Sequence, residues 1–407
     1  MPSNSSTSSS DRSGANGTDA GAAGPGGRDV GGRDADGWRF LLRGLAFLSP
    51  FLAALLLECC VLPLDAFTFR VWEAAKRSRW DSVFPPGPFY PNLAIDRVET
   101  GDLASHTAAA VPKRVRWRTD RFGYRRENTA REDWDVVVIG DSFVAGTGLT
   151  QADMLTERLA ARTGLAVYPL AHDRWPRHLL REARFRDHPP RIVVLAHCER
   201  TLGYLRAPDP DPPEPEASAP AWTWPAATRI NHMRKRAMLR FARARVRDAV
   251  ASVGRPLFFG EAYAPVRLRG VRGERGEFLF LFGPEVNRLY PPEAIPGFVE
   301  RLVRWRDRFA ADGIRFLYLP IPNKENIYHE RLEAGPPPAF LARLHRAAAA
   351  AGLETVDLES RYRAHRASGD ERLYHTDDTH WTPLGVRIAA DALADAIASD
   401  PAPAPHP

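Results

Sequence analysis

The sequence predicts an α/β fold in which a doubly wound parallel sheet carries helices on both faces. Five short apolar runs, rich in β-branched residues, are typical of buried parallel strands; they lie at residues 134–139, 165–170, 191–196, 314–320 and 353–358. Helical periodicity accompanies them at residues 151–162, 298–309, 339–351 and 384–398. Strands that alternate with helices of this length favour a parallel sheet with its core among these runs.

Composition limits what kind of protein this is. The chain has 407 residues with ten Trp and twenty Phe, which excludes a wholly disordered protein. Its three Cys exclude both a disulfide-stapled scaffold and a zinc site made of four cysteines. The formal charge is +6, but no nucleic-acid-binding motif accompanies the many Arg, so we expect no nucleic-acid partner. A basic face for acidic polysaccharide or lipid headgroups stays open.

The N-terminal region predicts a tail followed by a membrane anchor. Residues 1–37 are mostly Gly, Ser, Asp, Ala and Asn and are expected to be disordered. Residues 38–69 carry four charged side chains, and within them residues 44–64 are long enough as a helix to cross a hydrocarbon core of about 30 Å. We therefore expect one transmembrane helix in a lipid bilayer, with a buried helix of a soluble domain as the alternative. Four basic residues on each side leave the orientation open.

The rest of the chain divides into a connecting segment and one α/β domain with an insertion. We assign residues 70–114 to the connection and residues 115–400 to the domain, with the insertion at about 203–295. After an acidic, Pro-rich stretch the insertion contains a basic, helix-like run at residues 229–250. That run is interpreted as a solvated helix face, with a helix on a membrane surface as the alternative. Residues 278–282 fit a strand of the inserted part.

A Gly-Asp-Ser turn follows the first predicted strand. Gly140 allows a sharp bend, and Ser142 would then stand at or near a helix N-terminus, where backbone N–H groups can receive an oxyanion. Ligands of parallel sheets collect at this carboxyl end of the strands. An ordinary Asp or Ser helix cap is the alternative interpretation.

A second polar motif, His-Thr-Asp-Asp-Thr-His-Trp at residues 375–381, precedes the last predicted helix. An Asp two or three residues before a His can orient the imidazole, and such a His can act as a general base for a serine elsewhere. A polar helix cap and a metal site are the alternatives; the candidate metal ligands are His375, Asp377, Asp378 and His380. The metal alternative leaves the Gly-Asp-Ser turn unexplained, and no zinc, phosphate-loop or dinucleotide spacing occurs, so we expect neither metal nor cofactor.

The Gly-Asp-Ser turn and the Asp-Thr-His-Trp motif together resemble those of the SGNH (GDSL-type) hydrolase superfamily, and the resemblance covers residues 115–395 or so. It implies an SGNH-type three-layer α/β/α domain with a parallel sheet. It also implies that Ser142 is the nucleophile and His380 the base. Asp378 would orient the base, with Asp377 as the fallback.

Two further segments resemble the alginate O-acetyltransferase-like group of this superfamily: Ile-Pro-Asn-Lys-Glu-Asn-Ile-Tyr at residues 321–328 and Cys-Glu-Arg-Thr-Leu at residues 198–202. The resemblance implies an O-acetyltransferase or acetylesterase acting on a cell-surface or exported polysaccharide. It further implies a single-pass protein of the cytoplasmic membrane, a catalytic domain outside the cytoplasm and a membrane acyl-donor protein as a partner. Lys324 and Tyr328 become candidate substrate contacts; a solvated charge and a strand-end aromatic are the alternatives.

The chain departs from the superfamily's pattern at the oxyanion donors. After the second predicted strand it has Ala171, His172 and Asp173 without the usual Gly, and after the third it has Glu199 and Arg200 without the usual Asn. A backbone N–H near Ala171, or Arg200, is the candidate second donor. A catalytically degenerate SGNH fold that serves as a polysaccharide-binding or scaffold protein is therefore the alternative function.

Overall fold

The computed structural model describes most of the chain. It covers residues 30–68, 70–77, 84–85, 87–104, 109–172, 176, 179, 182–208, 219–234, 238–243, 246, 250, 278–281, 283–369 and 372–399. The chain forms two compact units, Met1–Leu57 and Glu58–Pro407. Of the predicted disordered tail, residues 1–29 lie outside the described part.

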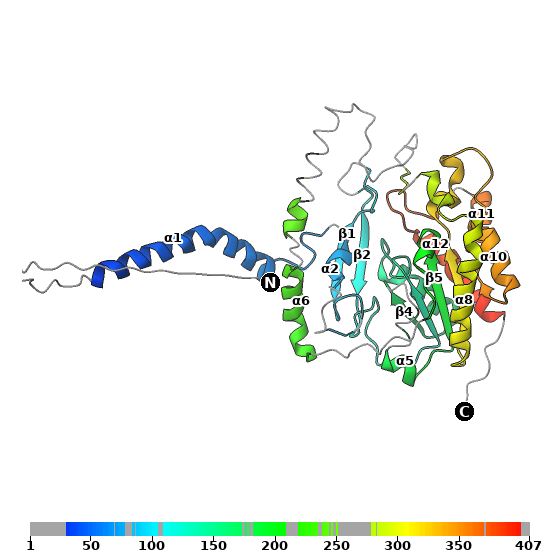
Figure 1. Cartoon of the computed structure of the whole chain (residues 1–407), viewed down its shortest axis with the longest axis horizontal. Helices are drawn as coiled ribbons and strands as arrows, with labels where there is room; N and C mark the ends of the chain where they lie inside the picture. The colour runs from blue at the N-terminus through cyan, green and yellow to red at the C-terminus, as the bar shows by residue number, and fades with distance from the viewer. Residues whose placement is uncertain are drawn as a thin grey trace, which may run out of the picture. The chain divides into compact units, whose positions relative to one another are not determined.

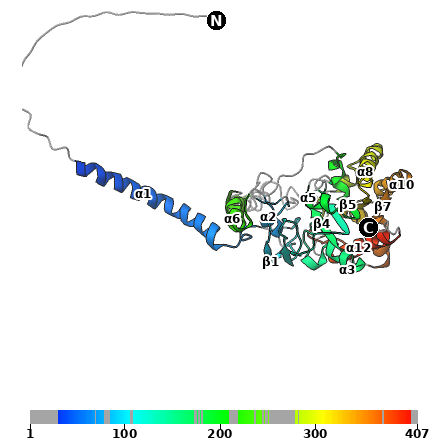
Figure 2. The same ribbon diagram turned by 90° about the horizontal axis from the view of Figure 1, so that it is seen from below.

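The first unit contains one long helix, α1 (Val30–Leu56), which is blue in Figure 2. Gly37–Val61 is the one described helical stretch that is long and apolar enough to cross a membrane, and none of its most apolar window is buried in the protein. As an α-helix its 25 residues would extend over roughly 37 Å, more than a hydrocarbon core of about 30 Å. This is consistent with a single-pass anchor. Residues 30–37 were expected to be disordered, but they belong to α1. A helix that has already formed extends readily into neighbouring residues.

The second unit is built on a five-stranded parallel sheet of order β4-β3-β5-β6-β7. The strands are β3 (Val136–Gly140), β4 (Val167–Ala171), β5 (Ile192–Cys198), β6 (Arg315–Ile321) and β7 (Glu354–Thr355). The predicted parallel sheet is thus confirmed. Because β4 and β5 lie on opposite sides of β3, the connections that follow β3 and β5 diverge, and ligands of doubly wound sheets bind at this place.

Helices cover both faces of the sheet, and Figure 1 shows several of them beside the strands. Successive strand residues point to opposite faces, so Val136 and Val138 pack on one side and Val137 and Ile139 on the other. The first core includes residues of α3 (Leu155–Thr163), α11 (Leu358–Ser368) and α12 (Pro383–Ala398). The second includes residues of α8 (Ile295–Ala310) and α10 (Phe340–Ala350). The three-layer α/β/α arrangement is confirmed.

The predicted strand at residues 353–358 is shorter than expected. Only Glu354 and Thr355 pair with β6. Asp357 then caps α11, since its side chain accepts a hydrogen bond from the backbone N–H of Ser360 at 3.0 Å. The Asp-x-x-Ser pattern that begins at Asp357 therefore ends the strand and starts a helix inside the apolar run that was predicted as a strand.

The described residues 278–281 form no strand, so that prediction is wrong for them. Their backbone binds loops at the carboxyl end of the sheet instead. The N–H of Leu279 donates to the carbonyl of Thr376 at 2.8 Å, and the N–H of Leu281 donates to the Glu325 carboxylate at 3.1 Å. Burial of Phe278 and Phe280 accounts for the apolar pattern without a strand.

Two unpredicted antiparallel strands, β1 (Ala94–Glu99) and β2 (Lys113–Arg118), form a separate sheet. With α2 (Val71–Ala75) they occupy much of the predicted connecting segment. Their buried apolar residues are Ile95, Val115 and Trp117. The strands were not predicted because charged residues occupy the positions between these side chains, so that the sequence has no apolar run.

The remaining described elements are short. The insertion contains α6 (Trp224–Arg234), with further helical residues at 238–243. Two other short helices are α5 (Ala183–Asp187) and α9 (Lys324–Ile327). A π-helical turn at Leu57–Val61 follows α1, and 3₁₀ turns lie at Gln151–Asp153, Glu199–Tyr204, Ala221–Thr223, Pro284–Arg288, Pro292–Ala294 and His329–Arg331.

Candidate active site

Ser142 stands on a tight turn directly after β3. A Cβ on Gly140 would lie 2.4 Å from the Val144 side chain and 2.6 Å from the Ala196 carbonyl oxygen, so only Gly fits there. The Asp141 carboxylate then fixes the turn: it accepts hydrogen bonds from the Phe143 N–H at 3.0 Å, the Cys198 N–H at 3.4 Å and the Thr201 hydroxyl at 3.2 Å. Ser142 itself is half-buried and therefore accessible.

His380 lies in a closed loop that leads into α12. The ends of this loop are joined because the N–H of Thr382 donates to the Leu373 carbonyl at 2.9 Å. Farther in, the N–H of His375 donates to the His380 carbonyl at 3.1 Å. The Thr382 hydroxyl accepts the Gly385 N–H at 3.3 Å and so caps α12. The N-cap of α12 is thus Thr382, and the cap hydrogen bond does not involve His380.

The two predicted motifs meet at the carboxyl end of the sheet. Ser142 Oγ lies 2.8 Å from His380 Nε2, and His380 Nδ1 lies 2.6 Å from Asp378 Oδ1. The imidazole also packs against the ring of Phe143, with centroids 4.8 Å apart. Hydrogen-bond contact from a hydroxyl through an imidazole to a carboxylate is the arrangement that lets a serine lose its proton during attack.

Electrostatics favour an ionised Asp378. Burial alone would raise its pKa, but the His380 ring and its hydrogen bond, together with Lys113 and Arg70, hold the pKa of Asp378 well below its ordinary value. Its Oδ1 also accepts the backbone N–H of His380 at 3.1 Å, which fixes the carboxylate relative to the ring. Asp378 can therefore stabilise a positive charge on the imidazole.

The fallback residue, Asp377, does not take the place of Asp378. Its carboxylate accepts hydrogen bonds from the N–H groups of Gly101 and Val111 and from Lys113 Nζ, each at 2.8 Å. A Cβ on Gly101 would lie 2.0 Å from the Asp377 carbonyl oxygen, so the two backbones meet closely. Asp377 therefore ties the histidine loop to the β1–β2 loop and to the first residue of β2.

Asp102, which sequence reasoning missed, is a second carboxylate beside the imidazole. It accepts both the N–H and the hydroxyl of Thr379 at 2.8 Å, and its Oδ2 lies 3.9 Å from His380 Nδ1. Arg70 stands 3.5 Å from it. Burial and the nearby Asp378 raise the pKa of Asp102. No local pattern could have indicated Asp102, because the histidine loop that it binds is more than 270 positions away in the chain.

Lys324 and Tyr328, predicted as substrate contacts, support the histidine loop from inside. Lys324 Nζ donates to the carbonyls of His375 at 2.5 Å, Asp378 at 3.0 Å and Thr376 at 3.2 Å. Burial lowers its pKa to about 7. The Tyr328 hydroxyl accepts the N–H of Leu373 at 3.0 Å. Both side chains are buried, and the contacts described here are with the histidine loop.

The segments that carry Glu199 and Lys324 brace each other. The Glu199 carboxylate accepts the N–H of Asn323 at 2.9 Å and the side-chain amide of Asn326 at 3.1 Å, and burial raises its pKa to about 7. In return the Asn323 side chain accepts the N–H of Arg200 at 3.1 Å. This cross-link holds the ends of β5 and β6 together beneath the site.

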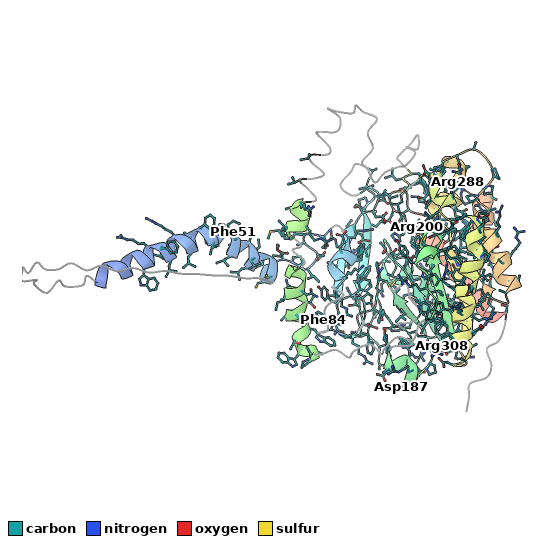
Figure 3. All side chains as sticks on the ribbon, viewed as in Figure 1. Phe51, Phe84, Asp187, Arg200, Arg288 and Arg308 are labelled. Atoms are coloured by element: carbon teal, nitrogen blue, oxygen red, sulfur yellow. The ribbon has the colours of Figure 1, made fainter. Side chains whose placement is uncertain are left out.

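Candidate oxyanion donors lie near Ser142. Among the described residues, no acceptor is found for the backbone N–H of Ser142. The backbone N–H of Arg200 is already bound, so Arg200 can offer only its guanidinium, which lies 5.5 Å above the Phe143 ring. Figure 3 shows Arg200 toward the end of the unit opposite Asp187 and Arg308. Arg200 follows the carboxyl end of β5, which is the end of the sheet where Ser142 stands.

The bend after β4 is made without glycine. Ala171 is the last residue of that strand and pairs with Gly140, which places it beside the serine turn. His172 follows with a φ of 37°, in the left-handed region that favours glycine. The chain thus adopts a left-handed backbone conformation at this corner without a glycine.

A metal site is a poor fit to this geometry. Asp102, Asp378 and His380 each offer a ligand atom, and these atoms lie within 4.8 Å of one another. However, the 2.6 Å separation between His380 Nδ1 and Asp378 Oδ1 is that of a charge-assisted hydrogen bond. An ion bound there would break this hydrogen bond. Asp377, a candidate ligand of the metal alternative, already forms an ion pair with Lys113.

Comparisons with known proteins agree with the motifs. Residues 281–407 match the family model described as the SGNH hydrolase-like domain of acetyltransferase AlgX. The chain is 32% identical over 97 residues to a probable alginate O-acetylase AlgJ of Pseudomonas syringae pv. tomato, covering 23% of this chain and 24% of that protein. It is 33% identical over 121 residues to one of Pseudomonas fluorescens, covering 29% and 30%. The chain thus spans less than a third of the length of these relatives.

A structural neighbour is LAE5, an α/β hydrolase enzyme from the metagenome of Lake Arreo, Spain. It is 15% identical and covers 65% of this chain and 95% of that chain, with a TM-score of 0.28, which is too low to support an argument. The family match includes Asp378 and His380 but not Ser142, which the structure brings to them. Through its motifs and this match, the chain is similar to the alginate O-acetyltransferase-like group of the SGNH hydrolase superfamily.

Proposed function

We propose that the chain is a serine acyl-ester enzyme that places acetyl groups on, or removes them from, a cell-surface or exported polysaccharide. The observation that carries the proposal is the hydrogen-bond contact from Ser142 Oγ through His380 to Asp378, at 2.8 and 2.6 Å. Two AlgJ relatives are named as probable alginate O-acetylases, which supports acetyl transfer to a polysaccharide.

The first half-reaction would acylate the serine. Ser142 Oγ attacks the acyl carbonyl carbon while its proton moves to His380 Nε2, and Asp378 stabilises the imidazolium. The Ser142 N–H and the Arg200 guanidinium are the proposed donors to the oxyanion of the tetrahedral intermediate. When the intermediate collapses, the bond to the leaving oxygen breaks, and that oxygen takes the proton from Nε2.

The second half-reaction would decide between transfer and hydrolysis. An acceptor hydroxyl of the polysaccharide, or water, gives its proton to His380 and attacks the acyl carbonyl carbon. The bond from that carbon to Ser142 Oγ then breaks, and Oγ takes the proton from His380 Nε2, which restores both residues. The candidate span favours an enzyme held at a membrane surface. We propose a catalytic unit outside the cytoplasmic membrane, where an exported polysaccharide is accessible, with a separate membrane protein as acyl donor.

Serine reactivity tests the proposal. A fluorophosphonate probe should label the wild-type chain and the Ser399→Ala control, whose serine is exposed after α12, but not Ser142→Ala. Acetyl release into water is then compared with transfer to an oligosaccharide to separate esterase from transferase. A wild-type chain that is neither labelled nor turns over acetyl esters would leave the polysaccharide-binding or scaffold protein as the function.

A further inference from the structure

The basic helical segment of the insertion is attached to the chain where the candidate span ends. Arg229 on α6 donates to the carbonyl of Leu62 at 2.8 Å, and the N–H of Met238 donates to the Glu58 carboxylate at 3.2 Å. The rings of Phe241 and Phe67 lie 5.6 Å apart. Since the span ends at Val61, these contacts hold the segment at the level where the chain leaves the apolar layer.

The segment exposes large apolar side chains instead of burying them. Trp222 is 82% exposed, and Leu239, Val246 and Val250 are 56, 64 and 66% exposed. Together with the exposed Ala242, the last three are spaced three or four positions apart, which is the sequence spacing of one helix face. Contiguous exposed apolar surface of this kind marks a site of interaction with a protein or a membrane.

Charge separates these two classes of partner. Between residues 219 and 250 the sequence has eight Lys or Arg and a single acidic residue, Asp248. Arg229, Arg240 and Arg243 are exposed. A helix with an apolar stripe beside arginines is typical of helices that lie in the interface plane of a membrane and attract anionic lipids.

We propose that α6 and the described helical residues 238–243, 246 and 250 belong to an interfacial segment that lies on the bilayer beside the exit of the span. Its apolar side chains enter the headgroup and acyl boundary, and its arginines bind anionic headgroups. The inference rests on the membrane anchor of the proposed function but not on acyl chemistry. It gives the protein a second attachment to the membrane in addition to the span.

The second attachment has a consequence for the active site. Arg97 on β1 donates to the carbonyl of Asp65 at 2.8 Å and to the Thr68 hydroxyl at 3.3 Å, so the post-span segment is bound to the β1–β2 hairpin as well. The loop between those strands supplies Gly101 and Asp102 to the histidine loop. The interfacial segment would therefore fix how the site faces the membrane surface.

Fluorescence of Trp222 tests the proposal in the full chain reconstituted into vesicles. The spectrum of Trp222→Phe is subtracted from that of wild type, which isolates the emission of Trp222. Brominated phosphatidylglycerol in the vesicles should quench most of this emission. The emission of the buried Trp134, isolated in the same way with Trp134→Phe, should remain unquenched. An unquenched Trp222 in chains that float with the vesicles overturns the proposal while leaving the anchor intact.

Variants identify the face involved. Leu239→Glu combined with Val246→Glu should abolish the quenching of Trp222, whereas Leu289→Glu, at a similarly exposed leucine outside the segment, should not. Thermal unfolding checks that each variant is folded. Loss of quenching in vesicles of brominated phosphatidylcholine alone supports the arginine–headgroup contact. If Trp222 is quenched only with two copies of the chain per nanodisc, or only after another protein is added, the partner is a protein and the proposal is overturned. Ester turnover tests the proposed function and does not bear on this inference.

Discussion

Replacing Gly101 by Ala tests whether the segment before the α/β domain helps to build the active site. A Cβ at residue 101 would lie 2.0 Å from the carbonyl oxygen and 2.4 Å from the carbonyl carbon of Asp377. Non-bonded carbon atoms are stable at about 3.5–4.0 Å. The loop that carries Asp378 and His380 must therefore move by about 1 Å or more, and the bond from the Gly101 N–H to the Asp377 carboxylate is strained or lost.

Such a shift acts on the rate of the chemical step. A misplacement of about 1 Å can cost on the order of 10²-fold in rate, so we expect kcat for a small acetyl ester to fall about 100-fold. Overpacking should also destabilise the fold by about 1–3 kcal/mol, and the melting temperature measures this separately. The matched control is Gly369→Ala, because no atom lies within 4 Å of a Cβ there and the backbone is extended.

One result would refute the reasoning. If Gly101→Ala stays folded and keeps more than half of the wild-type kcat, the contact between the two backbones does not hold the histidine loop in place. The same conclusion follows if Gly369→Ala loses activity to the same degree, because the loss would then not depend on the position of the glycine.

Three further substitutions separate the roles of the groups around His380. Asp378→Asn should lower kcat by about 10⁴-fold in ester turnover, and a loss below tenfold would contradict its assignment as the orienting acid. Asp102→Asn removes a carboxylate 3.9 Å from His380 Nδ1. Unit charges at that distance interact by about 4 kcal/mol at an effective dielectric of 20, and Arg70 offsets part of this energy, so we expect kcat to fall roughly 10–100-fold. An unchanged kcat would show that Asp102 has a purely structural role. Burial lowers the pKa of Lys324 from 10.5 to about 7, so between these values the unfolded chain holds a proton that the folded chain has lost, and the free energy of unfolding rises with pH. Lys324→Met should flatten that rise, which is at most about 5 kcal/mol, in denaturant titrations at pH 7 and pH 10; an unaltered pH dependence would show that the amine is not desolvated.

The sheet and the two motifs were predictable because their signals are local. A run of apolar β-branched residues indicates a strand that is buried on both faces of a sheet, and each of the five predicted runs contains a strand. The Gly-Asp-Ser turn and the Asp-x-His spacing each place a functional group relative to its own neighbours. Their meeting at 2.8 Å, however, depends on strand order, which a run of apolar residues does not encode.

The parts that escaped prediction depend on contacts between distant segments. Lys324 reads as a solvated charge in the sequence, and only the convergence of three loop carbonyls on its amine makes it a buried support. Asp102 sits in a loop that lacks any apolar period, so nothing nearby indicates a functional carboxylate. Residues 278–281 look like a strand because burial selects the same side chains whether the backbone pairs with a sheet or with loops.

The segment between the candidate span and β3 supports the site in three separate ways. Its Gly101 and Lys113 hold Asp377, and its Asp102 holds Thr379 beside the imidazole. It also supplies Trp72, whose ring stacks 5.6 Å from that of His172 at the bend after β4. A residue other than glycine at a φ of 37° is unfavourable by itself, and this stacking helps to hold it where the superfamily's glycine is missing. The candidate active site is therefore completed by the segment before β3, and the α/β domain alone does not contain it.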